Sequence, residues 1–168
     1  MHVCYKKSFS EAEFDYAQDH LRILSGLYGI LRPLDWMQPY RLEMGTKFNN
    51  SVGKNLYEFW GDKITDVVNK ELKKSKSEFL VNLASNEYFK SVKKKNITTP
   101  IITPNFKDAK NGEYKMISFF AKKARGAMTA YIIKNQVKTY EELLKFEWDG
   151  YLYNEQMSSD LNPVFTRG

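Results

Sequence analysis

The stretch from His20 to Gly45 concentrates residues that could bind a ligand, because charged and aromatic side chains there accompany glycines and prolines. Its first half is apolar and predicts a buried segment, whereas two prolines predict that regular structure stops near Arg32 and gives way to an ordered loop. Charged groups on an anchored loop are typical of binding sites, although a structural cluster of ion pairs explains them equally well. The groups concerned are Arg32, Asp35, Tyr40, Arg41 and Glu43.

A second set of polar residues occupies the segment from Asn82 to Tyr88, where a short apolar run gives way to the expected start of a helix. Backbone N–H groups at a helix N-terminus attract anions such as phosphate, so Asn82, Ser85, Asn86 and Tyr88 are candidate residues of a cleft. The same side chains would equally well cap the helix and satisfy its backbone. Glu87 is a candidate general acid or base, although no second carboxylate is evident beside it.

Three cations, Lys122, Lys123 and Arg125, fall where an expected strand gives way to a helix. Positive charge near a helix N-terminus opposes the helix dipole, which indicates a compensating anion. Lys122 and Arg125 are three residues apart and share a helix face, so that they can act on one anion, whereas Lys123 points elsewhere. That anion is either a bound phosphate or a carboxylate of the chain. The candidate carboxylates are those of Glu43, Glu87 and Glu155.

The positive charge of the chain is unevenly distributed. The net charge is +6, and residues 90–125 hold ten Lys and Arg against two Asp and Glu, which makes this segment +8 and the remainder −2. A one-sided basic field favours a polyanionic partner, with nucleic acid ahead of anionic lipid, although a solvated lysine-rich face has the same composition. The candidate nucleic-acid-binding residues are Lys90, Lys93, Lys94, Lys95, Lys122, Lys123 and Arg125.

Composition disfavours several classes of protein. The chain has 168 residues, no long apolar run and a single cysteine, Cys4, which argues against a membrane span, a disulfide and a cysteine-based metal cluster. His2 and His20 are the only histidines, so a histidine metal site or catalytic triad is not expected. We therefore expect a cytoplasmic protein with no membrane association, no metal and no cofactor.

Hydrophobic spacing predicts a mixed α and β domain in which helices flank the strands. Helices are expected over residues 11–22, over one continuous segment that follows Gly53, and over 86–92, 121–135 and the residues after Thr139. Strands are expected over 23–30, 79–84, 101–106, 114–120, 148–153 and 163–165, with a hairpin turn at Asn111-Gly112. The sequence Gly26-Leu27-Tyr28-Gly29 fits a strand that enters a glycine loop, which we favour, or the turn of a helix-hairpin-helix.

Five blocks of the chain, in the same order, resemble the YaaA family of bacterial peroxide-stress proteins. These are HLRILSGLYGILRPLDWMQPYRLEMG (20–45), LYEFWGDKIT (56–65), VNLASNEYFKSVK (81–93), ISFFAKKARGAM (117–128) and GYLYNEQMSSDLNPVFTR (150–167). Members of that family begin with a strand and a Ser-Pro-Ala-Lys-Thr element, which residues 1–8 do not match. We therefore expect residues 1–8 to be an unmatched, disordered N-terminus and residues 9–168 to form a partial YaaA-like domain of the α+β class that lacks its N-terminal portion.

The resemblance implies a basic cleft and a role in the response to peroxide and other oxidative stress, and it associates the family with a DNA-binding helical hairpin. Together with the charge, it predicts a protein that binds DNA phosphates in this cleft without strong sequence specificity. We expect binding rather than catalysis, the alternative being an enzyme that acts on a nucleobase or nucleotide in the same cleft. A missing N-terminal portion would also uncover apolar surface, which favours self-association, or would leave a non-functional remnant.

Overall fold

The computed structural model describes residues 9–168, which form two compact units that interleave along the sequence. The first unit holds residues 9–16, 81–83 and 101–168, and the second holds residues 17–80 and 84–100. Helices and short strands occur in both, which confirms the α+β class. The prediction of a disordered N-terminus concerns residues 1–8, which lie outside the described residues.

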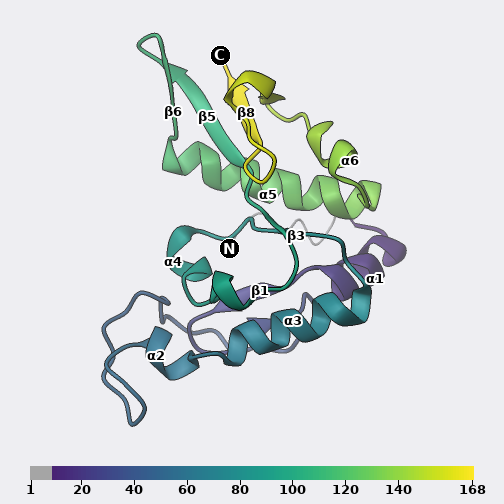
Figure 1. Cartoon of the computed structure of the whole chain (residues 1–168). Coiled ribbons are helices and arrows are strands. Elements are labelled where there is room, and N and C mark those ends of the chain that lie inside the picture. Colours follow the sequence, from purple (N-terminus) through teal and green to yellow (C-terminus); the bar gives the residue numbers. More distant parts are fainter. Residues whose placement is uncertain (1–8) are drawn as a thin grey trace. The chain divides into compact units, whose positions relative to one another are not determined.

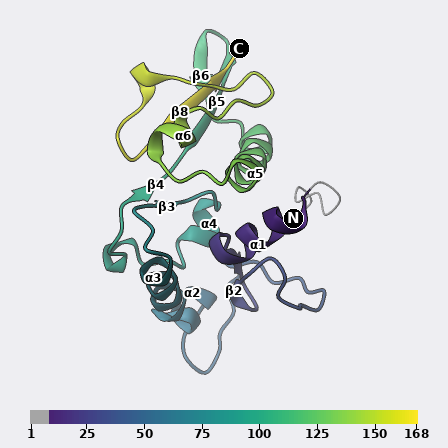
Figure 2. The ribbon, with the colours of Figure 1, turned by 90° about the vertical axis from the view of Figure 1, so that its right-hand side faces the viewer.

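The first unit is built on a four-stranded sheet with the order β6-β5-β8-β7 (Figure 1). β5 is parallel to β8, whereas the β5–β6 and β7–β8 pairs are antiparallel. The long helix α5 packs against β5, and the two views show it running beside the sheet (Figure 2). The main elements of this unit are β5 (Asn105–Lys110), β6 (Glu113–Lys115), α5 (Ser118–Asn135), α6 (Tyr140–Leu144), β7 (Leu152–Tyr153), η2 (Glu155–Met157) and β8 (Val164–Arg167).

Aromatic side chains fill the core of the first unit. The Phe106 ring stacks on Phe165 at 5.5 Å between ring centroids and meets Phe146 and Tyr151 edge-on at 6.0 and 5.6 Å. All four residues are buried, so this cluster supplies much of the apolar surface that the sheet removes from water. The cluster sits where neighbouring strands carry Phe106 opposite Phe165 in register.

A charge pair with a buried carboxylate, that of Asp108, lies beside this core. The Asp108 carboxylate accepts hydrogen bonds from Tyr151 Oη at 2.8 Å and from Arg167 Nε at 2.8 Å, and Arg167 also pairs with Asp149. Burial, followed by the hydrogen bond to Asp108, raises the pKa of the Tyr151 hydroxyl. The carboxylate is therefore satisfied in place, as a buried charge must be.

The second unit contains a short hairpin and a helical layer. The hairpin pairs Ile23 with Leu31 and Ser25 with Gly29, and α3 packs against its second strand. The buried face of α3 carries Ile64, Val68 and Leu72, which pack into the core of this unit. The elements of this unit are β1 (Ile23–Ser25), β2 (Gly29–Leu31), α2 (Leu56–Trp60), α3 (Lys63–Ser75), α4 (Asn86–Phe89) and η1 (Lys94–Asn96).

Three remaining elements complete the chain. Helix α1 (Glu11–His20) begins with a capping box, in which Ser10 and Glu13 exchange side-chain hydrogen bonds with each other's backbone N–H. β3 (Leu80–Val81) pairs with β4 (Ile101–Ile102) as a separate two-stranded sheet. The turn between β5 and β6 lies at Asn111-Gly112, as predicted, and both residues adopt positive φ angles, of 54° and 78°.

Several predicted boundaries are wrong for local reasons. The continuous helix expected after Gly53 is divided into α2 and α3, because Gly61 ends α2 with a φ of 52°. The strand expected over residues 101–106 is interrupted at Pro104, which has no N–H to donate. The strand expected over 114–120 ends at Lys115, and α5 begins three residues later. The strand expected over 79–84 is only the two-residue β3.

Candidate nucleic-acid interface

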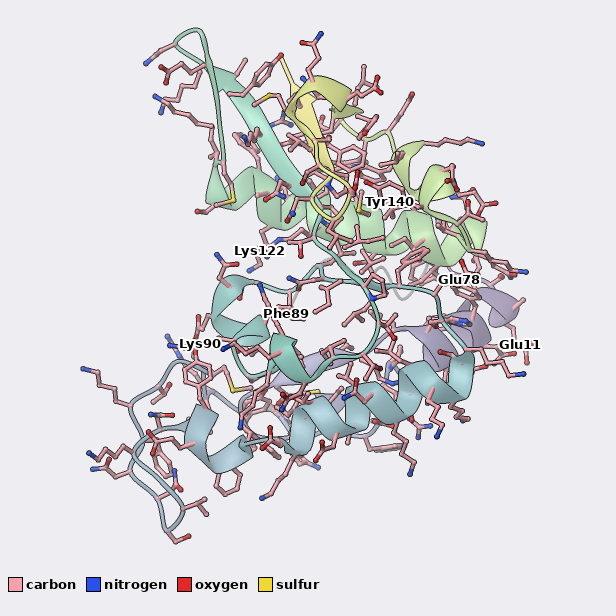
Figure 3. The ribbon with its side chains drawn as sticks, in the orientation of Figure 1. Glu11, Glu78, Phe89, Lys90, Lys122 and Tyr140 are labelled. Carbon is pink, nitrogen blue, oxygen red and sulfur yellow. The ribbon has the colours of Figure 1, made fainter. Side chains whose placement is uncertain are left out.

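The predicted DNA-binding cations fall into two groups, one in each unit. In the second unit, Lys90 directly follows α4, Lys93 precedes η1, and Lys94 and Lys95 lie within η1. Lys122, Lys123 and Arg125 lie on α5, in the first unit. Figure 3 marks one lysine of each group, Lys90 beside α4 and Lys122 on α5.

The lysines of the second unit are exposed but differ in their contacts. Lys93 Nζ lies 3.0 Å from an Asp62 carboxylate oxygen, so its charge is already matched. The Lys90 and Lys94 ammonium groups lie over the rings of Tyr57 and Phe89, at 4.9 and 5.4 Å from the ring centroids. A cation over an aromatic face keeps its charge and its hydrogen-bond donors, so these lysines stay available to an anion.

The three cations of α5 do not begin their helix. α5 starts at Ser118, so Lys122 occupies its second turn and opposes the helix dipole less than a first-turn cation would. The expectation of a compensating anion at a helix N-terminus was therefore based on a wrong boundary. Glu155 lies in the same unit, and neither it nor another described carboxylate of that unit is within ion-pair distance of Lys122, Lys123 or Arg125.

Arg125 differs from its two neighbours. Its Nε donates a hydrogen bond of 3.3 Å to the Ala121 carbonyl, and burial lowers the pKa of its guanidinium. Lys123 lies over the Phe119 ring at 4.4 Å, and Lys122 is exposed. The two lysines are therefore more accessible to a polyanion than the arginine.

The polar segment around α4 is held mainly by capping interactions. Ser85 Oγ accepts the N–H of Tyr88 at 3.4 Å, as expected for an N-cap. Glu87 Oε1 accepts the N–H of Gly45 at 2.8 Å, and Tyr57 Oη donates to the Glu87 carbonyl at 3.0 Å. The first bond ties α4 to the loop that follows β2, and the second ties it to α2. A general acid or base role for Glu87 stays a prediction.

Two polar side chains of that loop, Tyr40 and Glu43, form hydrogen bonds with β1 and α4 of the second unit. Tyr40 and Ser25 share a hydrogen bond of 2.5 Å between their hydroxyls, and Tyr88 Oη donates to Glu43 Oε2 at 2.7 Å. Burial, then the hydrogen bond to Glu43, raises the pKa of Tyr88 well above its usual range. The remaining candidate cleft residues are the exposed Arg41, the exposed Asn86, Arg32, which pairs with Asp35, and Asn82, which is buried and belongs to the first unit.

The glycine motif forms a β-hairpin turn. Gly26 and Gly29 flank the turn between β1 and β2, which confirms the strand interpretation; a helical hairpin is not formed at these positions. Trp60 Nε1 donates to the Gly26 carbonyl at 3.0 Å. A Cβ added at Gly26 would lie 2.3 Å from the Leu42 carbonyl oxygen, so the close backbone approach expected of this glycine is present.

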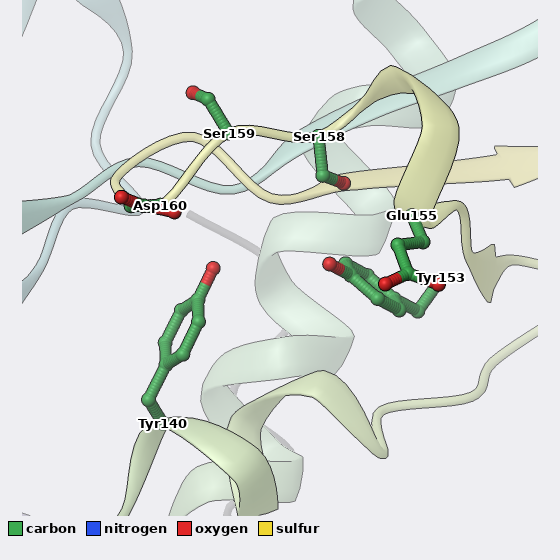
Figure 4. Close-up of a pocket in the computed structure, with 6 residues that line it drawn as sticks. All are labelled: Tyr140, Tyr153, Glu155, Ser158, Ser159 and Asp160. Carbon is green, nitrogen blue, oxygen red and sulfur yellow. The ribbon is translucent and has the colours of Figure 1, made fainter.

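The first unit contains a polar hollow that the sequence did not predict. Its volume is about 200 Å³, and its lining residues come from α6, from β7 and from the chain between β7 and β8 (Figure 4). They are Tyr140, Tyr153, Glu155, Ser158, Ser159 and Asp160. Burial, then the negative field of Tyr153 and Asp160, raises the pKa of Tyr140. The residues are scattered between positions 140 and 160, and no spacing rule connects them.

Two kinds of feature are absent from the described residues. Among residues 9–168 no helix combines the length and the apolar character that crossing a bilayer requires. The same residues contain no group of three or more His, Cys, Asp or Glu side chains that could hold a metal ion.

Comparison with known proteins gives a consistent family assignment. A family model described as peroxide stress protein YaaA matches residues 4–157. The chain is 67% identical over 160 residues to a UPF0246 protein of Saccharophagus degradans, and 64% identical over 160 residues to one of Teredinibacter turnerae. Each alignment covers 95% of this chain and 62% of the relative, so the chain spans less than two thirds of the length of these relatives. Because the matched segment is most of the chain, the protein belongs to the YaaA family of peroxide stress proteins.

Proposed function

We propose that the protein binds DNA through phosphate contacts, without strong sequence specificity, as part of the cytoplasmic response to peroxide stress. The stress role rests on membership of the YaaA family. The DNA-binding role rests on exposed positive charge. The basic cleft expected from the family resemblance stays a prediction.

The observation that carries the proposal is a set of exposed cations without carboxylate partners. Among the described residues of their own units, no carboxylate lies within 4.0 Å of these side chains. They are Lys90, Lys94, Lys95, Lys122 and Lys123. A lysine with no carboxylate neighbour contributes its whole positive charge to the electrostatic field that attracts a polyanion. When such lysines neutralise DNA phosphates, the counterions bound to the DNA are released, which favours binding.

The carboxylates of the basic segment are already engaged. Asp108 is buried and bonded to Arg167, and Glu113 lies 2.8 Å from Lys115 Nζ. Both carboxylates of residues 90–125 are thus paired with a cation, and neither is left to pair with the exposed lysines. Lysine is a flexible point charge that suits phosphate contacts, which position a protein on DNA but do not read its sequence.

The second unit is the stronger contributor. Its residues include fourteen Lys and Arg against nine Asp and Glu, a net charge of +5. The described residues of the first unit include ten Lys and Arg against eleven Asp and Glu, a net charge of −1. Lys94 and Lys95 are therefore better probes of DNA contact than the α5 cations.

Substitution of Lys94 and Lys95 by alanine tests the proposal. The double variant should bind unrelated duplexes more weakly by similar factors, and the slope of log K against log salt should fall by roughly 0.9 for each lost phosphate contact. Fluorescence anisotropy at several salt concentrations measures both quantities. Lys122→Ala/Lys123→Ala repeats the test on α5.

The matched control removes two exposed lysines of the same unit from α3. Lys70→Ala/Lys73→Ala lowers the net charge equally but leaves the segment around η1 intact. Equal losses in the two double variants would show a general field rather than contacts at Lys94 and Lys95. An unchanged salt slope in the Lys94/Lys95 variant would contradict the proposed contacts.

One observation favours the alternative of an enzyme acting on a nucleobase or nucleotide. Glu43 and Tyr88 form a 2.7 Å hydrogen bond on a surface that also carries Tyr40 and Arg41, which provides proton-transfer groups and aromatic rings. Incubation with nucleosides, nucleotides and single-stranded DNA, followed by chromatography, should reveal a product if this is correct. Product formation that Glu43→Gln abolishes would support the alternative.

A further inference from the structure

The loop between β2 and the Ser25-bonded Tyr40 presents apolar side chains to solvent in an unusual manner. Trp36 has 98% of its surface exposed, and its neighbours Leu34 and Met37 are 53% and 50% exposed. A single exposed apolar residue is ordinary, but three of the four residues from Leu34 to Met37 form an apolar tip. The fourth, Asp35, accepts a hydrogen bond from the backbone of the loop.

The backbone of this loop is fixed although its tip is exposed. Asp35 Oδ2 accepts the N–H of Arg32 at 2.8 Å, and the Asp35 N–H donates to the Arg32 carbonyl at 3.1 Å. The N–H of Leu34 donates to Gln18 Oε1 at 3.0 Å, and that of Gln38 donates to Tyr28 Oη at 3.0 Å. Hydrogen bonding to Arg32 lowers the pKa of Asp35, so its carboxylate stays charged.

Aromatic residues support the far end of the loop. The rings of Tyr28 and Tyr40 meet edge-on, with centroids 5.5 Å apart, and the Tyr40 hydroxyl is held by the buried Ser25. Pro33 and Pro39 further restrict the chain on both sides of the tip. The Trp36 ring is therefore presented on a pre-organised loop, which reduces the ordering cost of any contact it makes.

We propose that Trp36 stacks on an unpaired base of DNA, so that the protein prefers gapped or single-stranded segments to intact duplex. This rests on the proposed function, because the phosphate contacts of the same unit would bring the loop to DNA. Indole rings stack on any base, and each such contact strengthens binding without sequence preference. An intact duplex offers no free base face, because its bases are already stacked and opening a step is costly.

Charge and area favour this occupant over another protein. The unit that carries the loop has a net charge of +5, and the exposed Arg41 follows Tyr40 directly. Three side chains offer a few hundred Å² at most, whereas a stable protein interface buries about 800 Å² on each partner. The tip is the size of one or two bases, and its surroundings suit a polyanion.

The test uses the whole chain, two labelled DNAs and one fluorescent base. The DNAs are an intact duplex and the same duplex with a three-nucleotide gap that contains 2-aminopurine. Trp36→Ala should weaken binding to the gapped DNA at least about fivefold and change binding to the intact duplex less than twofold. Binding of the parent chain should quench the 2-aminopurine, and Trp36→Ala should remove most of this quenching.

The matched control is Phe48→Ala, which removes another exposed aromatic ring of the same unit, outside the anchored loop. It should bind both DNAs within twofold of the parent. An unchanged thermal melt of Trp36→Ala would show that the fold is retained, as expected for a side chain with almost no buried surface. Trp36→Phe, which keeps a ring, should retain part of the preference.

The outcomes separate this inference from the proposed function. Salt-dependent binding of both DNAs by the parent, with no effect of Trp36→Ala, would overturn the stacking role and leave the phosphate contacts standing. Failure of the parent to bind intact duplex would contradict the proposed function. If Trp36→Ala instead abolished self-association in light scattering and left gap binding unchanged, the tip would be a surface for a second copy.

Discussion

The two units of the chain differ in the kind of interaction that stabilises each of them internally. The first has a four-stranded sheet and a cluster of buried aromatic rings, centred on Phe106 and Phe165. The second combines its helices with a hairpin of two three-residue strands, and its chain from Arg32 to Asn55 contains no helix or strand. That long segment is ordered by hydrogen bonds from side chains to backbone, such as those of Asp35 and Glu87.

This difference bears on where function is found. A sheet satisfies its backbone internally and leaves side chains to pack, whereas an irregular segment needs polar side chains to satisfy its N–H groups. The net charge of the second unit is +5, against −1 for the described residues of the first. We infer that the first unit is mainly structural and that the second carries most of the binding surface.

The largest expected effect comes from the aromatic core of the first unit. Phe106→Ala should destabilise the chain by about 3 to 5 kcal/mol, because it leaves a cavity among three rings that cannot close over it. Hydrogen exchange should show faster opening of β5 and β8 than of α3, since the hydrogen bonds of the sheet all lie within the first unit.

Phe119→Ala is the matched control, because that ring is 61% exposed and its loss creates no cavity. It should change stability by less than about 0.5 kcal/mol. Equal acceleration of exchange in β5 and α3 by Phe106→Ala would show that the units open together, and would weaken the comparison.

A smaller effect is expected where the second unit depends on backbone contact. At Gly26 an added Cβ would meet the Leu42 carbonyl oxygen at 2.3 Å, and backbone cannot rotate away as a side chain can. Gly26→Ala should therefore destabilise the chain by roughly 1 to 3 kcal/mol through overpacking. Thermal and denaturant unfolding would measure this change.

Gly112 provides the control for Gly26. It has a φ of 78°, with open space around the added Cβ, so Gly112→Ala reports the cost of the backbone angle alone, about 1 kcal/mol. A Gly26→Ala variant no less stable than the parent would mean that the segment after β2 can shift, and that the second unit is less fixed than its hydrogen bonds indicate.

Helix starts and tight turns could be predicted from sequence because their signals are local. The helix starts at Glu11 and after Thr139, the N-cap at Ser85 and the turn at Asn111-Gly112 all form as expected. Each depends on two to four neighbouring residues whose side chains satisfy nearby backbone groups. The family could be recognised for the same reason, since its blocks are contiguous in sequence.

Strand lengths and long-range contacts were not predictable in this way. The apolar run from Phe79 to Ala84 has strand character, but β3 extends over only two residues, because its length depends on the partner β4 and that strand ends before Pro104. The buried pair of Asp108 and Arg167 joins residues 59 positions apart, and no spacing rule finds it.

The candidate site was predictable in composition and not in detail. The sequence identified the cations of residues 90–125, but not the Asp62 carboxylate that matches Lys93 or the burial of Arg125. Trp36 has a large aromatic side chain that could fill a core, and yet it is almost fully exposed. Exposure depends on what the rest of the chain covers, which hydrophobicity alone does not encode.

The smallest expected effect concerns the acid stability of the second unit. Arg22 donates two hydrogen bonds to backbone, to the Gln18 carbonyl at 2.9 Å and the Leu21 carbonyl at 2.8 Å, and it forms an ion pair with Glu71. The hydrogen bond from Arg22 lowers the pKa of Glu71 below its ordinary value of 4.5. The pair should thus stabilise the fold above about pH 4.5, and this contribution should be lost as the pH falls through the lowered folded-state pKa.

Glu71→Gln measures that contribution. At pH 7 the variant should be less stable than the parent by about 1 kcal/mol, because the pair is only partly buried. The difference should vanish once the pH lies below the lowered folded-state pKa of Glu71, where the parent carboxyl is also neutral. Glu78→Gln, which removes an exposed carboxylate of the same unit, should change stability at pH 7 by less than about 0.5 kcal/mol. A Glu71→Gln deficit that persisted unchanged to low pH would show that shape rather than charge is lost, and the second unit would then depend on packing as the first does.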